Sequence, residues 1–265
     1  MHEFDESTDD LAWAIFRYAL DRVRTDPPLD GPRSHQELWE AVGQTITEEG
    51  LGGESALAAF ADHLAPACLS TDHPRFLSFV PGAPTNASVL FDLVVGASAM
   101  CATSWLEAAG TVYAENQALR WVADLVGLPE GAGGCFASGG TMGNLSALIA
   151  GRDHAMRRRE ADGSGRPVRW AVVASDGAHS SIDSAARVMD VDVLLATTGD
   201  DRRLRGEAVR AAIAARPEGT EVFAVVATAG TTNLGVVDAL GEVADAAAEH
   251  GAWFHVDGAY GGAAL

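Results

Sequence analysis

The chain has 265 residues, a formal net charge of −19 at pH 7 and a hydrophobic content of 48%. This length allows a large buried core with an appendage, and the apolar content excludes an intrinsically disordered chain. The acidic surface disfavours nucleic acid and anionic membranes as partners and favours a small-molecule ligand.

The cysteines and the N-terminal residues indicate the cellular compartment of the protein. Cys68, Cys101 and Cys135 are odd in number and are not paired at metal-ligand spacing, so we expect a reducing compartment and no metal site. The N-terminus is acidic where a signal peptide would be basic, and no uninterrupted apolar run is long enough to span a bilayer. We therefore expect a cytoplasmic protein.

Residues 1–72 predict helices with no strands between them. Apolar residues recur at helical spacing over 9–24, and this helix stops at two prolines. Ser34 and Glu37 have the spacing of a capping box, and a further helix is predicted over 54–69. The segment is expected to be an N-terminal helical arm that buries its apolar faces on the main domain or on a second subunit.

The next stretch, residues 73–82, is extended and aromatic. It either anchors the arm as a buried loop or lines a pocket. Residues 87–99 are apolar almost all round, which predicts a buried helix, and residues 111–125 predict a longer helix that ends at a glycine.

From residue 135 onward, strands and helices alternate. Near-continuous apolar runs predict five strands, with helices between them near 142–158, 180–189, 205–215 and 237–250; the strands are expected over 135–137, 170–174, 191–195, 222–227 and 253–256. This pattern predicts an α/β domain over 73–265 with a mostly parallel sheet covered on both faces. Ligands of such folds bind beyond the carboxyl ends of the strands.

Four polar clusters each follow a predicted strand: 138–141, 176–181, 228–232 and 255–262. In the first, Gly139 and Gly140 remove side chains from the backbone and Thr141 offers a hydroxyl at a helix start, which is typical of an anion cradle. By itself it also fits an ordinary strand-to-helix connection.

The other clusters are ambiguous when taken singly. His179 fits a capping or core histidine, and Asp257 fits a helix cap or a metal ligand. Together at one sheet edge, a phosphate cradle, an imidazole, hydroxyls and a buried carboxylate suit a phosphorylated aromatic cation.

In this order, the clusters resemble those of the group II pyridoxal-phosphate-dependent amino-acid decarboxylases. This family includes the aromatic amino-acid, glutamate and 2,4-diaminobutyrate decarboxylases and shares the aspartate-aminotransferase-like fold, fold type I. The resemblance covers nearly the whole chain and rests on His73-Pro-Arg-Phe76, Phe79-Val-Pro81, Ser104-Trp-Leu-Glu107, Glu115 with Trp121, and His255-Val-Asp-Gly-Ala-Tyr260. It implies pyridoxal 5'-phosphate as cofactor, decarboxylation of an L-amino acid, and a homodimer.

The resemblance also implies a role for each matching residue. Ser138, Gly139, Gly140 and Thr141 would bind the cofactor phosphate, with Thr232 nearby. His179 would stack on one face of the pyridine ring, Ala259 would touch the other face, and Asp257 would pair with the ring nitrogen. Phe79, Val80 and Pro81 would line the substrate pocket, where Val80 replaces an aromatic residue common in the family and leaves the side-chain preference open.

One family residue has no counterpart in this sequence. The family's Schiff-base lysine follows a histidine downstream of the His-Val-Asp motif, whereas all 18 Lys or Arg positions here are arginines. The expected small C-terminal domain is absent too. The chain is therefore expected to be the N-terminal part of a decarboxylase, inactive by itself.

Two alternative functions stay open, and a third is less favoured. Another fold type I activity would be an aldehyde-forming deaminase, a lyase or an aminotransferase, and a non-catalytic cofactor-binding remnant would explain the missing lysine. A nicotinamide-binding Rossmann domain fits poorly, because residues 139–143 lack the three-glycine spacing of that fingerprint.

Overall fold

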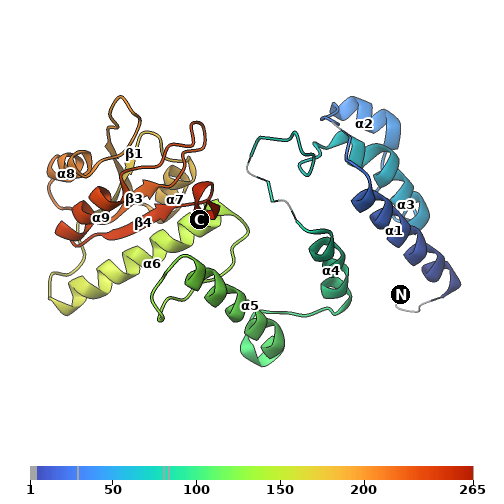
Figure 1. Ribbon diagram of the computed structural model, residues 1–265, viewed down its shortest axis with the longest axis horizontal. Helices are drawn as coiled ribbons and strands as arrows, with labels where there is room; N and C mark the ends of the chain where they lie inside the picture. Colours follow the sequence, from blue (N-terminus) through green and yellow to red (C-terminus); the bar gives the residue numbers. More distant parts are fainter. Residues whose placement is uncertain (1–4, 29, 80, 83, 265) are drawn as a thin grey trace. The chain divides into compact units, whose positions relative to one another are not determined.

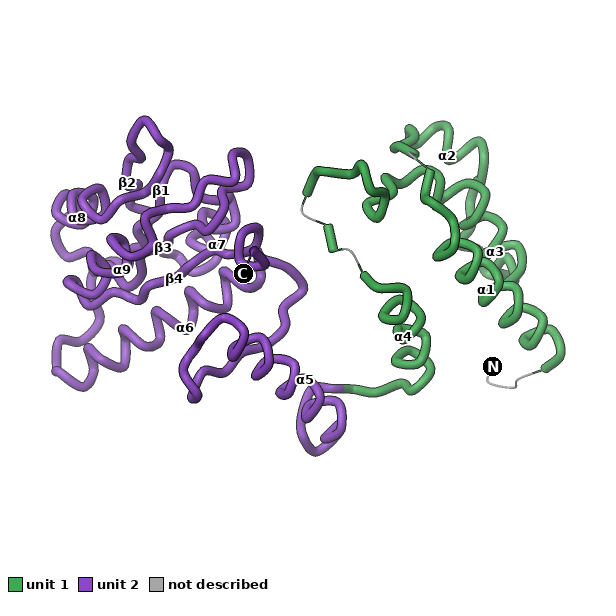
Figure 2. The backbone as a smooth tube through the Cα atoms, viewed as in Figure 1, with its two compact units in different colours: residues 1–101 green, residues 102–265 purple. Residues whose placement is uncertain are grey.

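A computed structural model describes residues 5–28, 30–79, 81–82 and 84–264. They group into two compact units, residues 1–101 and 102–265 (Figure 2). The predicted division into 1–72 and 73–265 is not the same as this grouping and stays a prediction.

The first unit is helical, as its sequence indicates. Its helices are α1 (Glu6–Arg24), α2 (His35–Val42), α3 (Gly53–Ala59) and α4 (Asn86–Ala97), and α3 continues as a π turn (Phe60–Leu64) and a 3₁₀ turn (Ala65–Ala67). The backbone N–H of Glu37 donates to Ser34 Oγ, and the N–H of Ser34 donates to the Glu37 carboxylate. The predicted capping box at the start of α2 is therefore confirmed.

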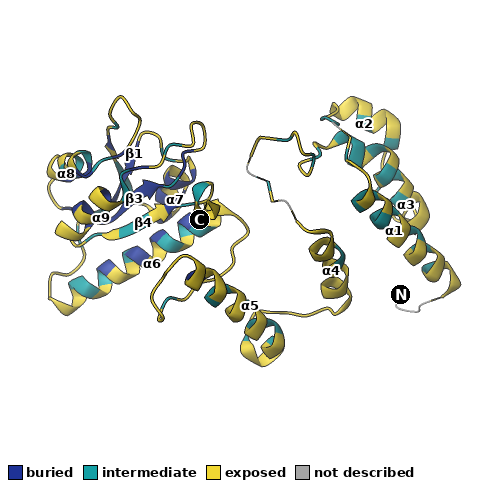
Figure 3. Cartoon of the chain, viewed as in Figure 1, coloured by how far each residue is buried: buried dark blue, intermediate teal, exposed yellow. Residues whose placement is uncertain are grey.

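Helix α4 is exposed, which contradicts the buried helix predicted over 87–99. Phe91 is 62% exposed and Leu93 is 58% exposed, and no residue of α4 is buried (Figure 3). Apolar composition on every side predicts burial only where another element covers the helix, and no described residue of this unit does so.

The second unit contains the sheet. Its elements are α5 (Trp105–Leu125), α6 (Gly140–Ala161), β1 (Arg169–Ser175), α7 (Ser181–Met189), β2 (Asp192–Ala196), α8 (Gly206–Ala214), β3 (Thr220–Thr228), α9 (Leu240–Glu249), β4 (Trp253–Asp257) and a 3₁₀ turn (Gly261–Ala263). The strand order is β2-β1-β3-β4, and every pair is parallel. The predicted parallel α/β fold is confirmed.

Both faces of the sheet are covered (Figure 1). On one face, Val172 packs in a cluster with Leu148 of α6 and Ile182 of α7. On the other face, the adjacent Val173 packs with residues of α8 and α9. Because successive strand side chains point to opposite faces, a near-continuous apolar strand supplies two cores at once.

The predicted strand over 135–137 does not form. Residues 132–137 have no regular structure, and Phe136 is 64% exposed. A strand needs hydrogen bonds to a neighbouring strand, and none of the four described strands pairs with this segment.

Among the described residues, no helix is long and apolar enough to cross a bilayer.

Candidate cofactor site

Two of the predicted clusters meet at the carboxyl ends of β3 and β4. Thr228 and Asp257 are register partners in these strands. Beyond them, the N–H of Ala229 donates to the Asp257 carbonyl and the N–H of Gly261 donates to the Ala229 carbonyl, both at 2.9 Å. The loops that follow the two strands are therefore tied together by backbone hydrogen bonds.

The other two clusters reach the same edge of the sheet. A Cβ atom added to Gly140, at the start of α6, would lie 3.0 Å from the Cβ of Ala259. A Cβ atom added to Gly177, in the loop after β1, would lie 3.8 Å from Thr231 Cγ2. The structure thus brings all four clusters together, and a side chain at Gly140 would require Ala259 to shift by a few tenths of an ångström.

The first turn of α6 leaves backbone donors unpaired. The carbonyl of Gly139 accepts hydrogen bonds from the N–H groups of Met142 and Gly143, and no side chain caps the helix. The N–H groups of Gly140 and Thr141 have no acceptor among the described residues, and Ser138 to Thr141 are exposed. Free N–H groups at the positive end of a 22-residue helix form an anion-binding arrangement.

Asp257 is buried and is held by two donors. The residue is only 6% exposed. Asn144 Nδ2 donates to Oδ2 at 2.9 Å, and the N–H of Ala259 donates to Oδ1 at 3.2 Å. These bonds leave each oxygen a further lone pair, so the carboxylate can still accept from a ring N–H.

Asn144 is a site residue that the sequence analysis missed. It is 5% exposed, and besides Asp257 it contacts Ser181 Oγ through Nδ2 and His255 Nε2 through Oδ1, each at 2.9 Å. Burial lowers the pKa of His255, an effect that the Asp257 charge opposes, and the neutral ring donates Nε2–H to Asn144. A polar residue in the buried stripe of α6 was the signal that could have identified it: Asn144, Leu148, Gly151 and Ala155 are the buried positions.

His179 is exposed, and Ser181 fixes its ring. The backbone N–H of Ser181 donates to His179 Nδ1 at 3.1 Å, and Ser181 Oγ lies 2.9 Å from the same nitrogen. Nδ1 therefore acts as an acceptor, which assigns the proton of the neutral ring to Nε2. Nε2 has no partner among the described residues.

The two threonines after β3 have different environments. Thr231 is buried, and its Oγ1 accepts a hydrogen bond from the N–H of Val236 at 3.1 Å, so it shapes the loop. Thr232 is exposed and so can contact a ligand. Of the pair, Thr232 is the one that fits the predicted role near the phosphate.

Thr228 carries a buried hydroxyl without a hydrogen-bond partner in the described part of the chain. It lies at the end of β3, beside Asp257. Its N–H donates to the carboxylate of Asp238, a second buried acid whose pKa is raised by burial and which also accepts from the N–H of Leu204. An unpaired buried hydroxyl is unfavourable, so this atom suits contact with a bound ligand or water.

The predicted substrate residues belong to the other unit. Phe79 is 85% exposed with a positive φ of 62°, Pro81 is half-buried, and Val80 lies outside the described residues. These positions fall in residues 1–101, whereas the four clusters fall in 102–265. Their role in binding substrate stays a prediction.

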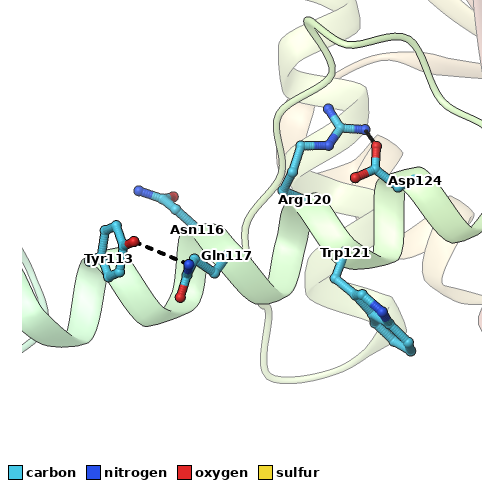
Figure 4. Close-up of a pocket in the computed structure, with 6 residues that line it drawn as sticks. All are labelled: Tyr113, Asn116, Gln117, Arg120, Trp121 and Asp124. Carbon is cyan, nitrogen blue, oxygen red and sulfur yellow. Dashed lines mark hydrogen bonds and ion pairs between the residues drawn. The ribbon is translucent and has the colours of Figure 1, made fainter.

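A hollow of about 380 Å³ lies on the surface of α5 (Figure 4). Its walls come from that single helix, and four of its polar side chains interact in two pairs: Gln117 Nε2 donates to the Tyr113 hydroxyl at 3.1 Å, and Arg120 pairs with Asp124 at 2.7 Å. It includes none of the predicted cofactor residues. Convergent polar groups occur at the sheet edge instead.

Comparisons with known proteins agree with this geometry. Residues 37–265 match the sequence profile described as "Pyridoxal-dependent decarboxylase conserved domain". The chain is 32% identical to the aromatic-L-amino-acid decarboxylase of Bacillus atrophaeus, over 86% of this chain and 47% of that protein. It is 33% identical to the L-2,4-diaminobutyrate decarboxylase of Rhizobium meliloti (strain 1021), over 97% of this chain and 54% of that protein.

The fold is similar to that of a solved structure of the same kind. The crystal structure of Oryza sativa TDC with PLP and tryptamine matches with a TM-score of 0.85 and 26% identity, over 100% of this chain and 57% of that chain. The chain therefore spans about half the length of the relatives that it matches.

Proposed function

The chain belongs to the pyridoxal-dependent decarboxylase family, and we propose that it forms the cofactor-binding part of an enzyme that converts an L-amino acid to an amine and carbon dioxide. The cofactor is pyridoxal 5'-phosphate. Relatives that act on aromatic and on diamino acids match at similar identity, so the amino-acid side chain is left open.

One observation carries the proposal: a buried, doubly hydrogen-bonded carboxylate lies at the same sheet edge as an uncapped helix start. A ligand with a phosphate at one end and a pyridine nitrogen at the other suits this pair of groups. The first turn of α6, with Ser138, would hold the phosphate, and Thr232 would lie nearby. Asp257 would hold the ring nitrogen, with His179 and Ala259 on the two faces of the ring.

The chain's own residues would orient the cofactor and hold one proton. When bound, pyridoxal phosphate supplies an electron sink for the electron pair left as carbon dioxide departs. Asp257 would keep the proton on the ring nitrogen, because a negative charge favours the protonated form. The hydrogen bond from Ser181 holds His179 through Nδ1, and the imidazole would stack on one face of the ring in that orientation.

The proposed reaction also needs a lysine, and this sequence has none. We therefore propose that the active protein supplies this lysine from residues outside the 265-residue chain. The chain by itself would then be inactive. By analogy with the family, the active form is a cytoplasmic homodimer that binds a small-molecule amino acid.

Product analysis tests the reaction class. The full-length protein that carries this chain is incubated with aromatic, acidic and diamino L-amino acids, and the products are identified by mass spectrometry. We expect one amine and one carbon dioxide per amino acid consumed. An aldehyde with ammonia would support the alternative deaminase, and no turnover of any amino acid would support the non-catalytic remnant.

The phosphate cradle gives a second test. Thr141→Val keeps the shape of the side chain but removes its hydroxyl, so pyridoxal phosphate binding by the full-length protein should weaken by about 1–3 kcal/mol, the loss of one hydrogen bond to a charged group. The dissociation constant is measured by fluorescence titration. Ser146→Ala, an exposed change on the same helix, is the control and should leave affinity unchanged. Equal affinities for Thr141→Val and the wild type would rule out this assignment.

A further inference from the structure

We infer that Asn144 is a positioning residue that locks Asp257 to helix α6, so that the phosphate cradle and the carboxylate for the ring nitrogen keep a fixed separation. The inference rests on the proposed function and adds a residue to that site. It follows from where Asn144 lies in the helix and from the three hydrogen bonds of its amide.

The position of Asn144 connects the two ends of the proposed cofactor site. It lies four residues after Gly140, one turn along the helix whose start forms the cradle. Its Nδ2 reaches Asp257, which is 113 residues away in sequence at the end of β4. A rigid helical turn therefore joins the groups that would hold the phosphate to the group that would hold the ring.

The orientation of the amide is determined by its partners. An ionised Asp257 only accepts hydrogen bonds, so Nδ2 must face it and Oδ1 must face the other way. Oδ1 then accepts from His255 Nε2–H, and the second hydrogen of Nδ2 is donated to Ser181 Oγ. A flipped amide would place Oδ1 against the carboxylate, so the amide has one stable orientation.

Ser181 extends the network to His179. Its Oγ accepts from Asn144, which leaves its own O–H to donate to His179 Nδ1. The same amide is thus connected, directly or through one hydroxyl, to both the proposed partner of the ring nitrogen and the proposed stacking residue. Polar networks of this kind are rigid when every member is satisfied.

Comparing two ligands, pyridoxal phosphate and pyridoxal, which lacks the phosphate, separates positioning of the ring from binding of the phosphate. Asn144→Leu keeps the volume of the side chain but removes its donors and acceptor, and should weaken binding of both pyridoxal phosphate and pyridoxal by about 10- to 100-fold. Thr141→Val should weaken binding of pyridoxal phosphate alone. Both ligands are titrated into the wild-type chain, each variant and the Ser146→Ala control, with circular dichroism to check folding.

A second measurement needs no cofactor. In the ¹⁵N-histidine spectrum of the wild-type chain, His255 should carry its proton on Nε2, favoured by about tenfold over Nδ1. In Asn144→Leu the acceptor is gone, and the excess of the Nε2 tautomer over the Nδ1 tautomer should fall. His255→Gln identifies the resonance. If Asn144→Leu does not fold, Asn144→Ala, which leaves room for water, takes its place. It is expected to change both measurements in the same direction.

Wild-type binding of both ligands by a folded Asn144 variant would overturn the inference, as would a loss confined to pyridoxal phosphate. An unchanged His255 tautomer in that variant would also overturn it, because Oδ1 would then not be its acceptor. If neither the wild-type chain nor the full-length protein bound either ligand, the proposed function would fail, and the histidine spectrum would still decide whether Asn144 organises this network.

Discussion

Asp257→Asn is expected to lower the turnover number of the full-length enzyme by about two to three orders of magnitude, a size typical of removing one electrostatic contact to a reacting group. Asparagine has nearly the same shape but no charge, so the ring nitrogen would lose the partner that keeps it protonated. The neutral ring is a weaker electron sink, and the step that releases carbon dioxide would slow accordingly.

The measurement separates chemistry from folding. The turnover number is compared among wild type, Asp257→Asn and Asp183→Asn, an exposed aspartate of α7 that serves as the matched control. Circular dichroism should show that all three proteins are folded, and pyridoxal phosphate should still bind through the first turn of α6. Near-normal turnover in Asp257→Asn would remove Asp257 from the mechanism.

Borohydride reduction after incubation with pyridoxal phosphate is expected to leave the 265-residue chain unmodified. Borohydride traps a cofactor that is bound through a primary amine, and this sequence contains no lysine. The α-amino group at the N-terminus is the one remaining amine. Any cofactor that the chain binds through the cradle, Asp257 and His179 is therefore expected to stay a free aldehyde or its hydrate.

Intact-mass spectrometry decides this prediction. The expected spectrum shows the unmodified chain, whereas the full-length protein treated in parallel should gain one reduced cofactor per chain. Any labelled peptide is located by digestion, which separates trivial modification of the N-terminus from a site in the folded core. A stoichiometric adduct within residues 102–264 would reveal another nucleophile and would contradict the inactivity proposed for this chain.

The sequence by itself determined the fold class and the cofactor. Apolar runs of strand length alternating with helical periods predicted β1 to β4 within a few residues, because hydrophobic periodicity is a local property. Where pairing or burial depended on other elements, the local pattern did not predict the outcome correctly. The run at 135–137 found no strand to pair with among those described, and α4 is exposed despite its apolar composition.

Only the tertiary structure decided how the predicted residues are held. Asn144 is an ordinary helical residue in the sequence, and its partners Ser181 and His255 lie 37 and 111 residues away. The sequence likewise does not distinguish the buried Thr231 from the exposed Thr232. Residue types report what chemistry a site can perform, whereas hydrogen bonds across such separations exist only after the helices and strands have packed.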